Sequence, residues 1–341
     1  MVQAYGADTG NDNAEPPRAG SRFRAGLARL KADRGIWRRG ILLAVCSVLV
    51  MLVMVFHAEI PNRLGNLGSL TETFLPWIGV LLPVLLILGL VRRSATALIA
   101  LLLPLVVWLN LFGGLLLDDK SGPGGNLTVA THNVNAGNPD PAGTAEQVAG
   151  SGADVVALQE LPSGQVAAYE KALKAPYPYH SVQGTVGLWS KYPLSNTRPV
   201  DIKMGWVRAM RSTVTAPGGK VAVYVAHLPS VRVKLHAGFT ANQRDNSADA
   251  LGEAISDEPL SRVILLGDLN GTMNDRALRA VTSQMRSTQG AAGDGFGFSW
   301  PAAFPMARID QIMVRGVEPM SSWTLAATDS DHLPIAARVQ L

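Results

Sequence analysis

Apolar residues are concentrated in the first third of the chain, where three long runs follow one another. They cover residues 36–56, 74–91 and 95–117, and apart from Arg38 and Arg39 none of them carries a charge. A helix needs about 20 apolar residues to cross a bilayer, so the pattern predicts three transmembrane helices within residues 36–117. A cleaved signal peptide or a buried helical hairpin is the alternative, but no small-residue cleavage site precedes Glu59 and two more runs follow.

The pattern changes at residue 127 to short β-rich segments separated by turn residues and a few helices. Strands are predicted at 127–133, 154–160, 185–190, 210–215, 221–226, 263–266, 309–314, 323–326 and 335–339, and helices after 144 and over 165–174, 242–255 and 275–284. Strands that alternate with occasional helices predict an α+β fold, with a two-layer β-sandwich flanked by helices. Residues 118–126, which include Ser121-Gly122-Pro123-Gly124-Gly125, are predicted to tether this domain (127–341) to the membrane helices.

Charge gives the membrane segment a direction. Residues 1–40 hold eight Lys and Arg against four Asp and Glu, and Arg92 with Arg93 separates the second and third runs. Basic flanks stay on the cytoplasmic side, so residues 1–35 are predicted to be a basic cytoplasmic tail. Three spans then place the 127–341 domain on the extracytoplasmic side of a multi-pass cell-membrane protein.

Two short strings in the last third carry chemistry. Gly267-Asp268-Leu269-Asn270 follows a strand-like run, and Ser330-Asp331-His332 follows another. Hard cations such as Mg²⁺ take carboxylate oxygens, and an attacking water needs an oriented acceptor. Acidic, amide and imidazole groups at strand ends therefore predict metal-assisted phosphoester hydrolysis. Taken alone, each string could also be an ordinary turn.

With these strings, four further positions resemble the endonuclease/exonuclease/phosphatase superfamily, also called the DNase I-like fold. They are Asn133 at the first strand end, Glu160 in Gln159-Glu160, His227 in Ala226-His227-Leu228-Pro229, and Asp310 in Arg308-Ile309-Asp310. The resemblance spans residues 127–341, with the motifs in the family's order. The combination with membrane helices is similar to actinobacterial teicoplanin-resistance membrane proteins, which implies a role in glycopeptide resistance.

The resemblance implies a role for each residue and a divalent cofactor, Mg²⁺ or Mn²⁺. Glu160 would hold the ion, with Asn133 and Asp331 completing or supporting its ligand shell. Asp268 would orient or deprotonate water with the help of Asn270. His332, held by Asp310, would stabilise the phosphate, and His227 would donate to a non-bridging oxygen.

The substrate is not set by the fold. Membrane helices and a short tether favour a lipid-linked or envelope phosphate ester. Residues 121–341 hold eighteen Lys and Arg against eighteen Asp and Glu, and this even balance argues against nucleic acid, whose binders carry a basic footprint. Extracellular nuclease activity remains the alternative. Several basic and aromatic side chains could line the substrate mouth or simply cover the surface: Arg208, Arg211, Arg232, Lys234, Arg244, Trp206, Phe239, Phe296 and Phe298.

Overall fold

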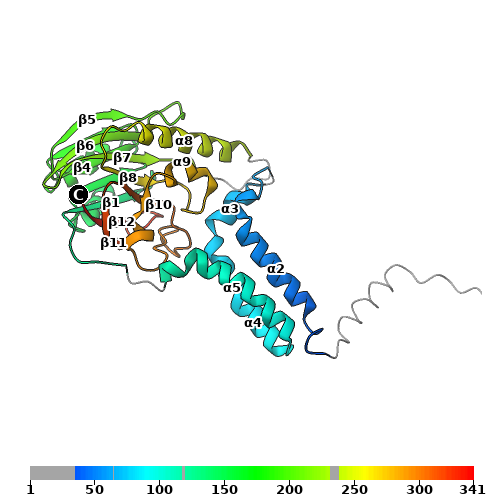
Figure 1. The fold of residues 1–341 in the computed structure, drawn as a ribbon. Coiled ribbons are helices and arrows are strands. Elements are labelled where there is room, and N and C mark those ends of the chain that lie inside the picture. Colours follow the sequence, from blue (N-terminus) through cyan, green and yellow to red (C-terminus); the bar gives the residue numbers. More distant parts are fainter. Residues whose placement is uncertain (1–34, 64, 117–119, 231–237) are drawn as a thin grey trace, which may run out of the picture.

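The computed structural model describes residues 35–63, 65–116, 120–230 and 238–341; of residues 238–241 it describes the backbone only. Nearly all of the predicted cytoplasmic tail (1–35), and Arg232 and Lys234, lie outside these ranges. The described chain forms a β-sandwich with helices on both outer faces, from which a bundle of apolar helices projects (Figure 1).

Each layer of the sandwich is a six-stranded mixed sheet. The first sheet contains, in spatial order, β11 (Glu318–Thr324), β12 (Ile335–Gln340), β1 (Leu127–Asn133), β2 (Val155–Gln159), β4 (Val186–Ser190) and β3 (Tyr179–Gln183). The second contains β5 (Leu194–Pro199), β6 (Ala209–Ala216), β7 (Gly219–His227), β8 (Val263–Asp268), β10 (Asp310–Arg315) and β9 (Arg286–Ser287). This arrangement confirms the predicted α+β sandwich.

Apolar alternation along the strands builds three layers of core. Side chains such as Val129, Val155 and Ile264 meet between the sheets. On the outer face of the first sheet lie α6 (Pro141–Ala149) and α7 (Val166–Leu173), and on that of the second lie α8 (Gly238–Ser256) and α9 (Arg279–Thr282). The central strands β2, β4 and β8 are buried along their whole length, because both of their faces are covered. Strands in such positions have largely apolar sequences. The remaining short elements are η3 (Arg276–Leu278) and α10 (Thr288–Ala292).

The number of predicted membrane spans needs correction. In the described residues one helix is long and apolar enough to span a bilayer, α5 (Ala95–Leu116). A second span results only if α3 (Leu67–Thr73) and the helical stretch of η2 (Leu75–Val80) and α4 (Leu81–Val91), bent by 71°, count as one. The first run forms α2 (Ile41–Val55), whose 15 residues extend about 22 Å, short of the roughly 30 Å hydrocarbon layer. The structure therefore has one or two candidate spans and not three.

The helical bundle nevertheless presents an unusually apolar surface. Among the described residues, all but three of the exposed large apolar side chains lie between positions 36 and 116; the exceptions are Tyr179, Trp206 and Phe304. Monomeric soluble proteins rarely expose continuous apolar areas of this kind, which mark membrane or protein contacts.

Buried polar contacts fix the helical bundle to the β-sandwich domain. They are made through α3, which follows η1 (His57–Glu59). Arg244 of α8 forms a buried ion pair with Asp275, with 2.6 Å between Nη1 and Oδ2, and donates to Ser69 Oγ at 3.1 Å. Thr272 Oγ1 donates to the carbonyl of Glu72. The bonds to Ser69 and Glu72 join segments 175 and 200 residues apart in the sequence.

The predicted tether is bound along the domain over the part that the structure describes. Lys120 Nζ donates to the Gly290 carbonyl, Gly122 N donates to Met320 O, and Asn126 N donates to Val339 O. Residues 120–126 thus follow the domain surface through defined hydrogen bonds.

Candidate active site

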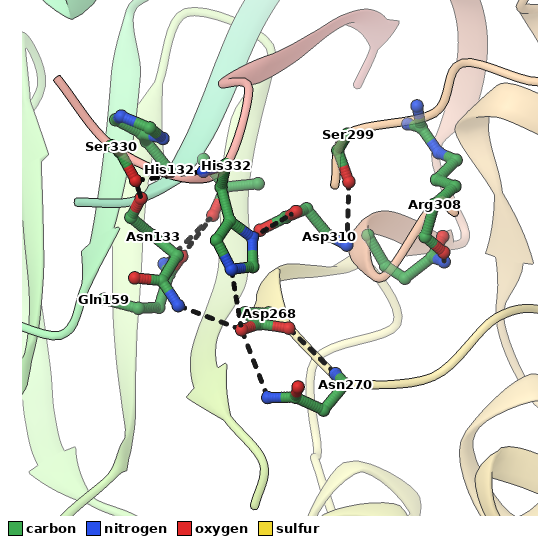
Figure 2. Close-up of polar contacts among 12 residues, drawn as sticks. His132, Asn133, Gln159, Asp268, Asn270, Ser299, Arg308, Asp310, Ser330 and His332 are labelled. Atoms are coloured by element: carbon green, nitrogen blue, oxygen red, sulfur yellow. Dashed lines mark hydrogen bonds and ion pairs between the residues drawn. The ribbon is translucent and has the colours of Figure 1, made fainter. Parts of the chain in front are cut away.

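The predicted site residues meet where five strand ends converge. Register pairs His227 with Asp268 across the parallel strands β7 and β8, and Asp310 with Asp268 across β10 and β8. Asn133 is the last residue of β1 in the opposite sheet. The site therefore lies at one end of the strands, between the two sheets. Figure 2 shows Asn133, Asp310, Asn270 and His332 arranged around Asp268.

Asp268 is the hub of this network. Its Oδ2 accepts from Asn133 Nδ2 at 3.0 Å and from Asn270 Nδ2 at 3.1 Å, and its Oδ1 accepts from the Asn270 backbone N–H at 2.8 Å. Asn270 reaches this position with a φ of +46°, a conformation that asparagine tolerates better than most residues. Its amide also donates to Leu228 O at 2.9 Å, which ties the turn after β8 to the end of β7.

Glu160 lies at the mouth of the site in a strained backbone conformation. It follows β2 with a φ of +60°, and a non-glycine residue held in this region is a frequent sign of a functional constraint. Its Oε2 accepts from the Ala136 N–H at 3.0 Å, and its Oε1 accepts from Asn133 Nδ2 at 3.2 Å. The side chain remains 33% exposed, so the carboxylate still faces the cavity.

His332 and Asp310 form a buried charged pair. The imidazole Nδ1 lies 2.8 Å from Asp310 Oδ2. Burial opposes the charge of His332, but the Asp310 carboxylate outweighs it and raises the histidine pKa to about 10. The same pairing holds the pKa of Asp310 below its usual value despite burial. Ser330 supports the loop, because its Oγ donates to Asn133 O and accepts from His332 N.

His227, unlike His332, is held in its neutral form. Burial, reinforced by the nearby Arg208 and His332 cations, lowers its pKa well below the ordinary value, so it is neutral at pH 7. Its Nε2 lies 3.5 Å from Glu160 Oε1 and 3.6 Å from Asp268 Oδ2. One neutral and one cationic imidazole therefore border the same space.

Burial also raises the pKa of Asp268 to about 7, although His332 and two hydrogen bonds act against that rise. A carboxyl group that titrates near neutrality is suited to exchange a proton with water at physiological pH. Asp331 differs, because it is exposed while its neighbour His332 is buried. It lies at the rim of the same cavity.

These groups open into a cavity of about 620 Å³. Six of the eight predicted residues line it, and the other two, Asn133 and Asp310, are bonded to lining residues. Sequence reasoning missed the wall formed by the helical segment. That wall consists of Asn66, Ser69, Leu70, Thr73 and Phe74. No local signal in residues 57–74 identifies it, since it depends on how the bundle docks.

The basic and aromatic candidates divide between several places. Arg208 and Trp206 line the cavity, and the guanidinium carbon lies 5.1 Å from the indole centroid. Arg211 is instead buried in an ion pair with Glu258, and Arg244 belongs to the buried polar contacts with α3. Phe296 and Phe298 pack towards the helical bundle, while the Phe239 side chain lies outside what the structure describes.

The donor set fits a divalent cation. Asp268, Asp310 and His332 offer ligand atoms within 4.8 Å of one another, and Asp310 Oδ1 is buried without a hydrogen-bond partner among the described residues. Because His332 is held as a cation, its ring must lose a proton before it can ligate a metal. Glu160 has no such conflict, since an exposed carboxylate is an acceptor in all of its lone pairs.

Comparison with known proteins identifies the family. The sequence profile described as "Endonuclease/Exonuclease/phosphatase family" matches residues 130–332, more than half of the chain. The chain belongs to the endonuclease/exonuclease/phosphatase family. It is therefore an enzyme of the phosphohydrolase and nuclease class, and the buried carboxylates and histidine agree with the divalent cation that this family uses.

Several solved structures share the fold of this chain. A Staphylococcus aureus beta toxin is 16% identical with a TM-score of 0.52, and the match covers 62% of this chain and 99% of the toxin. A Bacteroides thetaiotaomicron mannosyl-6-phosphatase is 16% identical with a TM-score of 0.52, covering 63% and 100%. Truncated Caenorhabditis elegans TDP2 is 21% identical with a TM-score of 0.51, covering 63% and 97%. No curated protein matches the chain.

Proposed function

We propose that this phosphoester hydrolase is anchored in the cell membrane by its helical bundle and acts, on the extracytoplasmic side, on a lipid-linked or envelope phosphate ester. One observation carries the proposal: the cavity that holds Asp268 and His332 is walled on one side by α3 and its flanking residues Asn66 and Phe74. The same bundle exposes the apolar helices α2, α4 and α5. A headgroup presented at a membrane surface would therefore meet the catalytic residues directly.

The residues have distinct roles in this proposal. Asp268, with a pKa near 7, accepts a proton from the attacking water, and Asn133 and Asn270 hold its oxygens in place. Cationic His332, kept charged by Asp310, stabilises negative charge on the phosphoryl oxygens. Neutral His227 donates a hydrogen bond to a non-bridging oxygen, and Arg208 adds positive charge at the cavity wall.

Glu160 is the principal metal ligand in the proposal, with Asp331 at the rim as a second carboxylate. Mg²⁺ or Mn²⁺ bound there would supply Lewis acidity and neutralise phosphate charge. The Asn133 amide nitrogen donates to both Glu160 and Asp268, so Asn133 supports the metal site by positioning two carboxylates.

The proposed membrane topology and resistance role extend beyond the family assignment. With α5 as the single span, the basic residues before α2 and between α4 and α5 support a cytoplasmic tail and an extracytoplasmic domain. Two spans would instead leave the tail and the domain on the same side of the membrane. The similarity to teicoplanin-resistance membrane proteins stays a prediction, and glycopeptide susceptibility of a deletion strain would test it.

The activity test uses the full chain in nanodiscs with Mg²⁺, given a polyprenyl diphosphate and plasmid DNA in parallel. We compare the wild type with Asp268→Asn and His332→Gln, and with Asp249→Asn, an exposed carboxylate on α8, as control. Release of phosphate from the lipid, lost on both active-site substitutions and with EDTA but kept in the control, is the expected result. Cleavage of DNA without lipid hydrolysis would overturn the substrate proposal and establish a membrane-tethered nuclease.

A further inference from the structure

A second cavity lies outside the active site, between the end of α5 and the catalytic domain. Its volume is about 500 Å³. Aromatic and aliphatic side chains form much of its wall, including Leu111, Phe112 and Leu115 from α5 and Phe296 and Phe298 from the domain. Phe296 and Phe298 stack with their centroids 5.0 Å apart. Only Thr73 lines both this cavity and the active-site cavity.

Three buried polar side chains in this apolar setting have polar atoms without a hydrogen-bond partner among the described residues. Arg308 is 6% exposed and donates from Nη1 to Gly297 O, but its Nε and Nη2 have no hydrogen-bond partner among the described residues. The side-chain oxygens of Gln289 and Gln311 are also buried without a donor. A buried polar group without a hydrogen-bond partner is destabilising, and a charged one more so, so these atoms are available to a ligand in the cavity.

The charge of the cavity specifies that ligand. Arg308, Lys120 and Arg286 line it, and no Asp or Glu is found among the described lining residues. Arg286 faces outward to Glu318, 3.2 Å away, which leaves Arg308 as the buried cation. In Figure 2 the Arg308 side chain leads away from Asp268, so its guanidinium is not part of the catalytic cluster.

We propose that this cavity binds an anionic phospholipid of the surrounding bilayer, with its phosphate at the Arg308 guanidinium and an acyl chain along the end of α5. Guanidinium forks pair with phosphate through parallel hydrogen bonds. A hydroxyl-bearing headgroup, such as that of phosphatidylglycerol, would in addition donate to the free oxygens of Gln289 and Gln311.

A soluble anion fits the cavity less well than a lipid does. The walls are largely apolar, and α5 exposes Val106 and Leu109 on its surface in the turns just before the cavity. A chain lying on these residues would remove their apolar surface from water, which is favourable. The site stands independently of the proposed catalytic substrate, because its polar groups are separate from Asp268 and His332.

The test measures lipid retention by the full chain, extracted into mild detergent with equal amounts of phosphatidylglycerol and phosphatidylcholine and analysed by native mass spectrometry. We expect retained phosphatidylglycerol to exceed phosphatidylcholine at least tenfold. Arg308→Gln removes the cation, and Ala291→Phe fills the cavity without changing charge. Arg338→Gln, an exposed arginine on β12, is the charge-matched control.

Loss of the preference in both Arg308→Gln and Ala291→Phe, with the preference kept in Arg338→Gln, would support the site. Melting temperatures measured beside each sample show whether a variant is folded, and Ala291→Phe keeps the test decisive should Arg308→Gln fail to fold. Equal retention of the two lipids by the wild type, or undiminished retention in Ala291→Phe, would overturn the proposal. Hydrolysis of the added phosphatidylglycerol would overturn it as well, since the lipid would then be a substrate.

Discussion

His227 and His332 border one cavity, the first as a neutral imidazole and the second as a cation, and their surroundings explain the difference. His332 has a carboxylate 2.8 Å from its Nδ1, whereas His227 is buried beside the cations Arg208 and His332. The pKa of the first is raised to about 10 and that of the second is lowered. In the proposed mechanism, His332 therefore stabilises charge and His227 donates a hydrogen bond, although both are histidines.

Asp310→Asn tests this division. The amide can still accept from His332 Nδ1, but the negative charge that keeps the imidazole protonated is gone. Since a raised pKa keeps a histidine charged until the pH exceeds it, wild-type activity should persist to about pH 9. In the variant the pKa falls towards 6.5, so kcat/KM should be roughly 10²-fold or more below the wild type at pH 8. That difference from the wild type should shrink as the pH is lowered to 6, where Asp268 is protonated to a similar extent in both proteins.

The measurement is a pH profile of phosphate release between pH 6 and 9.5 for both proteins. Asp249→Asn removes an exposed carboxylate of the same type and should leave the profile unchanged. An Asp310→Asn profile parallel to that of the wild type would contradict a charge-holding role for Asp310.

Individual site residues were predictable because each lies in a short motif at a strand end. Asp268 and Asn270 share one turn, so sequence alone places them together. The bond from Asn133 to Asp268 crosses between the two sheets, and the pKa of Asp268 depends on burial by segments distant in sequence. Neither property can be read from local spacing.

At the scale of elements, α3 links the two parts of the molecule. Ser69 Oγ accepts a hydrogen bond from Arg244 of the catalytic domain, and the Glu72 carbonyl accepts one from Thr272. Leu70 of the same helix lines the active-site cavity. A seven-residue helix is marginal alone, so the buried Arg244–Asp275 pair and its bond to Ser69 hold it in place. The helix therefore acts as a fixed wall of the substrate site.

Leu70→Arg should impair the proposed lipid reaction selectively. A charge on this wall disfavours an apolar substrate portion, and loss of one hydrophobic contact typically costs about 10- to 200-fold in kcat/KM. Turnover of a small soluble phosphoester should change little. Leu67→Arg lies on the same helix but outside the cavity, and it should behave as the wild type with both substrates.

The strands that sequence patterning predicted are mostly the central ones, such as β2, β7 and β8, whose apolar runs are unbroken. Patterning missed β3, β5 and β9. All three lie at the sheet edges, and the residues of β3 and β5 are largely exposed or half-buried. An edge strand packs on fewer neighbours, so its sequence carries less alternation to detect.

At the scale of the whole molecule, three apolar runs became one or two candidate spans. Composition detects apolarity but not the 71° bend after α3 or the late start of α2 at Ile41. The bend has a structural use, because it turns α3 across the catalytic domain. Among the described residues of the second run (74–91), Phe74 lines the active-site cavity.

The single cysteine, Cys46, allows the topology to be tested. In a Cys46→Ser background, Ser195→Cys places a thiol on the exposed part of β5, and Ser21→Cys places one in the predicted cytoplasmic tail. We expect a membrane-impermeant maleimide to label position 195 in intact cells and position 21 only after lysis. Labelling of position 21 alone in intact cells would reverse the orientation.

The wall that α3 contributes to the active site has a kinetic consequence. A site held at the bilayer surface samples substrate in two dimensions, so its rate follows the mole fraction of substrate among the surrounding lipids and not the bulk concentration. Diluting the substrate with inert lipid at constant total amount should then slow turnover in proportion, and adding more vesicles of unchanged composition should leave the reconstituted enzyme's rate as it was.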